Sequence, residues 1–383
     1  MPQTDPTDLI PADPAHPFAN PTEEPDYSPD YRAIVPELGV PGSRLPLLPT
    51  LAEKHTIRRY VSLACLILLF GFLIAASIST ALTLILRIVL RQVDAGAVGD
   101  LPQNYTVIIG QYMNDSSLGI GMTLLSFFIA NLAAYRAGCA LTHLHTKDFF
   151  HTHGLNFGRM LLYMVTALQI QLVTAYLGEW VVGFLERAGY SVLTVETTLQ
   201  KDNLMQLALT GLYTCVAAPI TEELLLRGVV MKNLSRVSQR FGILMSAFLF
   251  GLMHENVQQF LLAFPLGVLL GYITVRHNSL WPAITVHITV NLANMLVLCG
   301  ETYLPAGTMS TVMMIYTLAV IGLGTACAAF LFATQRLPDQ TPHQSIRSLR
   351  VAAASPVLWL LIATHVGMAV LGSLNLPENL IGW

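Results

Sequence analysis

Three charged residues interrupt an apolar, helix-forming stretch at APITEELLLRG, residues 218–228. A charged side chain at the centre of a bilayer costs at least about 2.5–3.5 kcal/mol, so each of them is a candidate for function. Glu223 and Arg227 are four residues apart and share a helix face, where they can form an ion pair that joins helices. Glu222 points about 100° away from Glu223, so this carboxylate is free to face a different partner.

Two further apolar segments carry polar side chains one helical turn apart. Phe250 and His254 share a face in FGLMH, and His287 and Asn291 share a face in HITVN. A single histidine on an apolar helix is more often a hydrogen-bonded core residue than a ligand. Neither segment therefore indicates a site by itself, and only the three segments together predict one.

The three segments supply a carboxylate, two imidazoles and a carboxamide. These groups can activate water against a carbonyl: a carboxylate or histidine takes the proton, and the second histidine and the asparagine stabilise the oxyanion. The helical rise puts Glu222 and His287 at similar depths, about 7–8 Å from one membrane surface. A straight helix would carry His254 ~20 Å deep, so a tilt or a bend at Glu255 is needed. We predict that one water-accessible site contains Glu222, His254, His287 and Asn291.

The ordered motifs EExxxR, FxxxH and HxxxN lie on separate hydrophobic segments between about residues 200 and 300. This order resembles the CPBP family (CAAX proteases and bacteriocin processing, also called Abi), which includes the type II CAAX prenyl endopeptidases. The resemblance implies an all-helical intramembrane endopeptidase with a cavity that opens to the cytoplasm. It implies that Glu222 activates water beside His254 and that His287 and Asn291 stabilise the oxyanion. It assigns supporting roles to Glu223, Arg227 and Phe250.

The metal requirement stays open at this point. Glu222, His254 and His287 would make a zinc set of two histidines and one glutamate, and these ligand types favour zinc binding. A metal-free site with Glu222 as the base is equally consistent with the sequence.

Three other patterns are interpreted as structural. HENVQ, residues 254–258, comes close to the zinc-protease pattern HExxH, but Gln258 occupies the second ligand position and amides bind zinc poorly. HLHTKDFFHTH, residues 143–153, could bind a transition metal, and we interpret it instead as an interfacial segment at the membrane surface. Gly267 and Gly271 form a GxxxG pattern, which we assign to close helix packing rather than to dimerisation.

The composition indicates a polytopic membrane protein. Of the 383 residues, 54% are hydrophobic and 11% are charged, whereas soluble domains average roughly 25% charged residues. A span needs about 20 apolar residues, so we predict an all-α transmembrane bundle of eight or nine spans. The segment 241–275 is ambiguous, because it is long for one span and short for two, with a break at Glu255-Asn256 or at Pro265. The predicted spans lie near residues 60–86, 117–138, 158–185, 203–226, 241–256, 258–275, 280–300, 311–334 and 354–374.

Residues 1–49 contain most of the prolines and eight acidic residues, which predicts a disordered acidic tail. Lys54, Arg58 and Arg59 precede the first span and place the N-terminus in the cytoplasm, although Arg87 and Arg91 then fall on the outer side. A bacterial cell membrane is the expected location. The predicted organisation is a cytoplasmic tail over 1–56, N-terminal transmembrane helices over 57–200, a catalytic core over 201–300 and C-terminal transmembrane helices over 301–383.

Two other functions are compatible with charges inside a membrane. Glu222, Glu223 and the histidines could relay protons in a proton-coupled transporter, or the fold could serve as a non-catalytic membrane scaffold. The ordered trio of motifs favours the protease over both. The expected partners are the lipid bilayer and a membrane-associated peptide or protein substrate, with no nucleic acid. A prenylated C-terminus, a leader peptide and a loop of a membrane protein all remain open as substrates.

Overall fold

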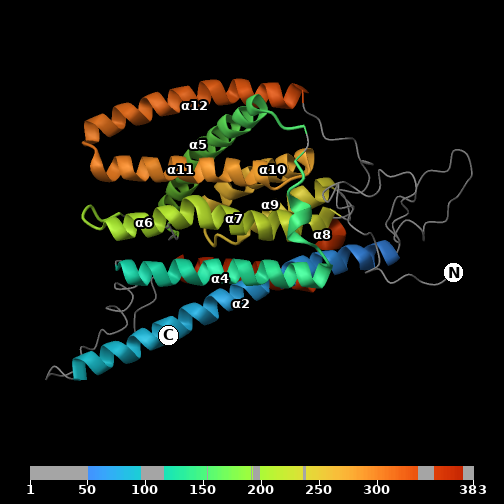
Figure 1. Cartoon of the computed structure of the whole chain (residues 1–383), viewed down its shortest axis with the longest axis horizontal. Coiled ribbons are helices and arrows are strands. Elements are labelled where there is room, and N and C mark those ends of the chain that lie inside the picture. The colour runs from blue at the N-terminus through green and yellow to red at the C-terminus, as the bar shows by residue number, and fades with distance from the viewer. Residues whose placement is uncertain are drawn as a thin grey trace, which may run out of the picture.

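The computed structural model describes residues 51–95, 116–152, 154–190, 192, 199–235, 239–334 and 349–373. Over these residues the chain forms a bundle of helices whose axes mostly run in one direction (Figure 1). The described residues contain no extended strand, and one isolated bridge joins Phe150 to Ser279. The main helices are α2 (Leu51–Ala95), α4 (Ser117–Thr142), α5 (Phe157–Arg187), a continuous helix over Leu204–Ser235, α9 (Gln239–Leu252), α10 (Val257–His277), α11 (Trp281–Tyr303), α12 (Ala306–Thr334) and α14 (Pro356–Ser373).

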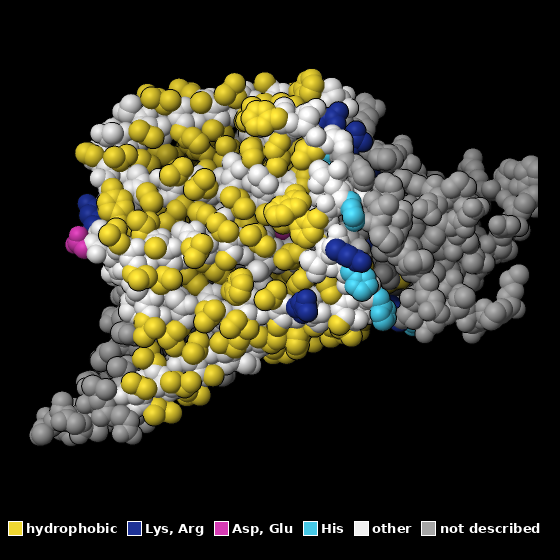
Figure 2. All heavy atoms as spheres, in the orientation of Figure 1, with side chains coloured by type: hydrophobic (Ala, Val, Ile, Leu, Met, Phe, Trp, Pro, Cys, Tyr) yellow, Lys and Arg dark blue, Asp and Glu magenta, His cyan; other side chains and the backbone are white. Residues whose placement is uncertain are grey.

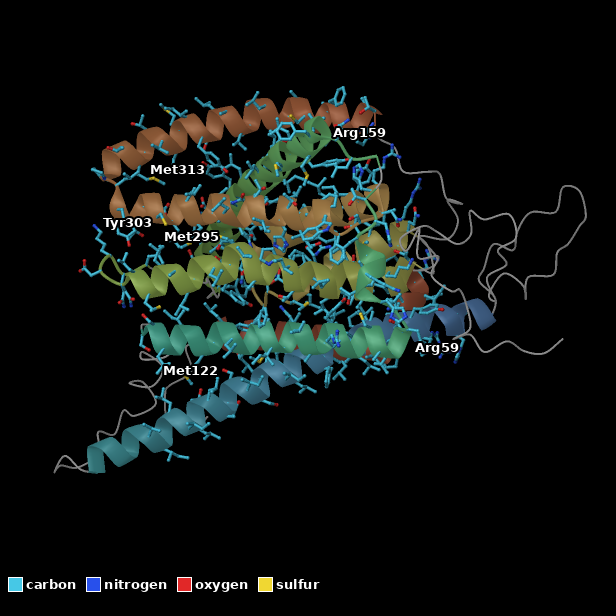
Figure 3. The ribbon with its side chains drawn as sticks, in the orientation of Figure 1. Arg59, Met122, Arg159, Met295, Tyr303 and Met313 are labelled. Atoms are coloured by element: carbon cyan, nitrogen blue, oxygen red, sulfur yellow. The ribbon has the colours of Figure 1, made fainter. Side chains whose placement is uncertain are left out.

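Seven of the described helices are long and apolar enough to cross a membrane. Two more apolar helices, Gln239–Leu252 and Pro356–Leu371, are shorter than a span. On the face that Figure 2 shows, hydrophobic side chains cover most of the helices, and most of the Lys, Arg and His side chains lie toward one end. Arg59 and Arg159 lie at one end of the bundle and Tyr303 lies at the other (Figure 3). The predicted all-α polytopic membrane bundle is confirmed.

The ambiguous segment 241–275 forms a helical hairpin. α9 ends at Leu252, α10 starts at Val257, and Glu255 between them has a left-handed backbone with φ of 57°. The side chain of Asn256 accepts a hydrogen bond of 2.7 Å from the first turn of α10, the usual contribution of an asparagine that precedes a helix. Pro265 lies inside α10. The break therefore occurs at Glu255-Asn256, the first of the two predicted positions.

The first helix is longer than predicted. α2 begins at Leu51, so the last residues of the predicted tail 1–56 are helical. No proline occurs between Pro49 and Pro102, and nothing in this stretch forces the helix to break. The part that can span a membrane is Ile57–Leu86, close to the predicted 60–86. The predicted disorder of residues 1–49 lies outside the described residues.

Two glycines allow α9 and α10 to pack closely. A Cβ atom added at Gly267 would lie 3.1 Å from Cα and Cβ of Ala247 and 3.2 Å from the Arg227 guanidinium. At Gly271 it would lie 3.2 Å from both Ile243 and the Met231 sulfur. The GxxxG pattern thus serves packing within the chain, as predicted, and Gly267 also leaves room for a buried arginine.

We expect Gly267→Ala to lower the melting temperature of the detergent-solubilised protein, because overpacking a dense contact costs typically about 1–3 kcal/mol. The matched control is Gly322→Ala in α12, where nothing lies within 4 Å of an added Cβ. Alanine is the better helix former, so the control should match or slightly exceed the wild-type melting temperature. An unchanged melting temperature for Gly267→Ala would contradict this tight contact between α9 and α10.

Candidate active site

The two adjacent glutamates lie at the end of α7 (Ala218–Glu223), within the continuous helix Leu204–Ser235. Wider π-helical segments flank α7: η3 (Tyr213–Ala217) precedes it and η4 (Leu224–Met231) follows it. Such π-helical turns occur frequently at functional sites. The helix is therefore irregular on both sides of the residues that the sequence singled out.

Glu223 is completely buried, and one of its oxygens accepts two hydrogen bonds. Arg227 Nη1 donates to Glu223 Oε1 at 2.7 Å, which is the predicted pair one helical turn apart. His287 Nδ1 contacts the same Oε1 at 3.0 Å. A carboxylate can only accept, so Nδ1 is the donor. Glu223 therefore joins the arginine to the histidine of α11, a link that was not predicted from the sequence.

The hydrogen bond to Glu223 orients the His287 ring. Its other nitrogen, Nε2, lies 3.8 Å from Glu222 Oε2, a separation too long for a direct hydrogen bond. The Glu222 side chain is 21% exposed, whereas those of His287 and Glu223 are 4% and 0% exposed. Glu222 is thus the more accessible of the two carboxylates, and it faces an imidazole nitrogen without being bonded to it.

The Phe250 ring lies among the charged and imidazole groups. Its centroid is 4.7 Å from the Arg227 guanidinium carbon, a cation–π contact. The His254 ring meets it edge-on with centroids 5.0 Å apart, and the His287 ring does the same at 5.7 Å. Arg227 also donates to the Gly267 carbonyl at 3.3 Å. Phe250 therefore connects α9 with the helices that carry Arg227 and His287.

His254 lies in the turn between α9 and α10, where the predicted bend at Glu255 is present. Its Nδ1 contacts the Phe250 carbonyl at 2.8 Å. A carbonyl oxygen only accepts, so Nδ1 carries the hydrogen and Nε2 remains for other contacts.

Asn291 reaches a backbone group of η3 rather than a glutamate. Its Nδ2 donates to the Thr214 carbonyl at 2.7 Å. In a π-helical segment this carbonyl would pair with the nitrogen five residues on, which belongs to Pro219 and has no hydrogen. Because Pro219 cannot donate, the Thr214 carbonyl is free to accept the hydrogen bond from the Asn291 amide. This hydrogen bond fixes α11 against the helix Leu204–Ser235, which carries Glu222.

The predicted zinc set was Glu222, His254 and His287. Among the described residues, no three His, Cys, Asp or Glu side chains lie close enough together to hold a metal ion. In this arrangement the three side chains do not form a metal site, and zinc binding stays a prediction. The histidine segment 143–153, interpreted from the sequence as interfacial, also forms no such group among its described residues, and His153 lies outside them. His143, His145 and His151 are exposed.

The fold and the site define a multi-pass membrane protein that holds a carboxylate–imidazole cluster between its helices. Residues 204–293 match a family model described as Rce1-like, type II CAAX prenyl endopeptidase Rce1-like. The match begins at α6 (Leu204–Leu212), ends in α11 and includes all three motifs. It supports membership of the CPBP (CAAX protease) family, and the resemblance noted in the sequence is confirmed. No curated protein and no solved structure matches the chain.

Proposed function

We propose that this chain is an intramembrane endopeptidase that uses water activated by Glu222. The observation that carries the proposal is the approach of Glu222 to a histidine whose other nitrogen is already hydrogen-bonded to buried Glu223. A carboxylate, an imidazole and a second carboxylate that orients the imidazole form the arrangement expected for acid–base catalysis. The family match supports a CAAX-type endopeptidase as the general activity.

In the proposed reaction, Glu222 takes a proton from water as the water oxygen attacks the peptide carbonyl carbon. The carbonyl electron pair moves to oxygen, and His287 Nε2–H and the second amide hydrogen of Asn291 stabilise the resulting oxyanion. His287 donates from both ring nitrogens in this step, and the carboxylates of Glu222 and Glu223 together balance its charge and that of Arg227. The C–N bond then breaks, and Glu222 returns its proton to the leaving nitrogen. His254 Nε2 helps to hold the attacking water.

The proposed substrate is a membrane-associated peptide or protein with a prenylated C-terminus, the class named in the description of the family model. We also propose that the N-terminus lies in the cytoplasm. Arg59, in the first turn of the span Ile57–Leu86, lies at the same end of the bundle as Arg159 (Figure 3), and the cytoplasmic side of a membrane protein is enriched in Lys and Arg. Proton-coupled transport would use the same charged residues, but the family match does not favour it.

We expect the purified full-length protein in liposomes to cleave a farnesylated CAAX peptide at one bond near its modified C-terminus. The controls are the same peptide without the lipid and a leader-type peptide, and mass spectrometry identifies the new ends. Cleavage of the leader peptide alone would support the peptidase activity and contradict the proposed CAAX-type substrate. No cleavage of any peptide, combined with proton uptake by the liposomes, would favour the transporter. Repeating the assay after exhaustive chelation, with metal analysis of the protein, tests the zinc prediction.

A further inference from the structure

A second carboxylate–histidine pair lies beside the candidate site and reaches outside the matched segment 204–293. His365 Nδ1, on α14, contacts Glu255 Oε1 at 2.9 Å. The His365 side chain is 4% exposed and that of Glu255 is 27% exposed. Because the carboxylate accepts, the histidine is the donor. The C-terminal helix is thus bonded to the residue that directly follows His254.

The turn that carries His254 needs external support. Glu255 has a positive φ, a backbone conformation that residues with a side chain rarely adopt and that costs free energy. Short contacts hold the turn from within: His254 N donates to the Gly251 carbonyl at 3.2 Å, and Asn256 Nδ2 donates to the His254 carbonyl at 3.0 Å. The Glu255 side chain is only partly exposed, so a hydrogen-bond donor stabilises its carboxylate.

α14 can supply rigid support because it is fixed to α2. Ser355, just before α14, hydrogen-bonds Ser62 of α2 at 3.0 Å. The His365 ring packs against the Phe72 ring of α2 in a T-shaped geometry, with ring centroids 5.3 Å apart. Leu361, one turn before His365, is completely buried in the same hydrophobic core as much of α2. His365 Nε2 has no hydrogen-bond partner among the described residues, so the polar contact of this histidine is directed to Glu255.

We propose that His365 is a positioning residue: through Glu255 it holds the His254 turn in the geometry that the proposed peptidase requires. Its expected effect on catalysis rests on the proposed function. When the hydrogen bond is lost, the turn can relax and displace the His254 imidazole. A displacement of about 1 Å caused by a change away from the reacting atoms can lower a rate about 100-fold.

The first test compares turnover per folded molecule for His365→Phe, His365→Asn and Leu361→Ala. The phenylalanine keeps a ring against Phe72 and removes the donor, and we expect a loss of kcat of about tenfold or more with KM nearly unchanged. The asparagine places an amide nitrogen near the position of Nδ1 and should recover most of the loss. Leu361→Ala removes one packing contact of α14 but keeps the Ser355 and Phe72 contacts and the hydrogen bond to Glu255. It should therefore lower the melting temperature and leave kcat near wild type. Equal kcat for His365→Phe and wild type would overturn the proposal, as would equal losses in His365→Phe and Leu361→Ala.

The second test does not depend on peptidase activity. Hydrogen–deuterium exchange of a peptide that covers residues 251–258 should become faster in His365→Phe and stay near wild type in Leu361→Ala. If no substrate is cleaved by any variant and this exchange still rises, the proposed function fails while the contact with the turn stands. If the exchange is unchanged, the proposal is wrong whatever the enzyme cleaves. Should His365→Phe fail to fold, Glu255→Ala removes the same hydrogen bond from the other side and is expected to show the same exchange pattern.

Discussion

Glu222→Gln should abolish peptide cleavage and leave the melting temperature nearly unchanged. The side chain is partly exposed, and its Oε2 is too far from His287 Nε2 for a direct hydrogen bond. Glutamine has the same shape, so the folded protein loses little stabilisation. It cannot accept a proton from water at neutral pH, and loss of a general base typically costs about 10²–10⁴-fold in rate.

The measurement is peptide cleavage beside a thermal melt in the same detergent. Glu179→Gln makes the same chemical change at an exposed position on α5 and should behave like the wild type in both measurements. Cleavage by Glu222→Gln at near wild-type rate would show that another group is the base, and the proposed mechanism would then be wrong.

Glu223→Gln should impair both stability and catalysis, because Glu223 balances buried Arg227 and also orients His287. Breaking a buried ion pair by neutralising one partner costs about 3–5 kcal/mol, since the other charge stays buried without compensation. We therefore expect a clearly lower melting temperature. We also expect a large loss of cleavage per folded molecule, because a neutral amide stabilises the charged form of His287 that the proposed mechanism uses less well than a carboxylate does.

Adding Arg227→Met to Glu223→Gln separates these two effects. The double variant removes the uncompensated cation and keeps an apolar side chain against Phe250, so part of the lost stability should return. Cleavage should stay low, because His287 still lacks its carboxylate. Full recovery of cleavage in the double variant would show that Glu223 supports folding alone. A wild-type melting temperature for Glu223→Gln would contradict the buried pair itself.

The positions of the helices were largely predictable from the sequence. A span requires a long apolar run, and such runs are visible without knowledge of their neighbours. The ion pair of Glu223 with Arg227 was also predictable from local sequence, because residues four apart on a helix lie on the same face whatever the helix packs against. The break at Glu255-Asn256 was one of two candidates, and the capping side chain of Asn256 decided it. The start of α2 was placed too late, because the predicted tail extended beyond its last proline.

The amino-acid sequence by itself determined which side chains are costly in a membrane and which of them share a helix face. It also determined the order of motifs behind the family resemblance, which the match over residues 204–293 confirms. Only the tertiary structure decided that His287 bonds to Glu223, that Asn291 bonds to the Thr214 carbonyl, and that His365 bonds to Glu255. These partners are 64, 77 and 110 residues apart. Periodicity gives the face on which a residue lies, but the rotation and depth of one helix against another follow from the packing of all their side chains.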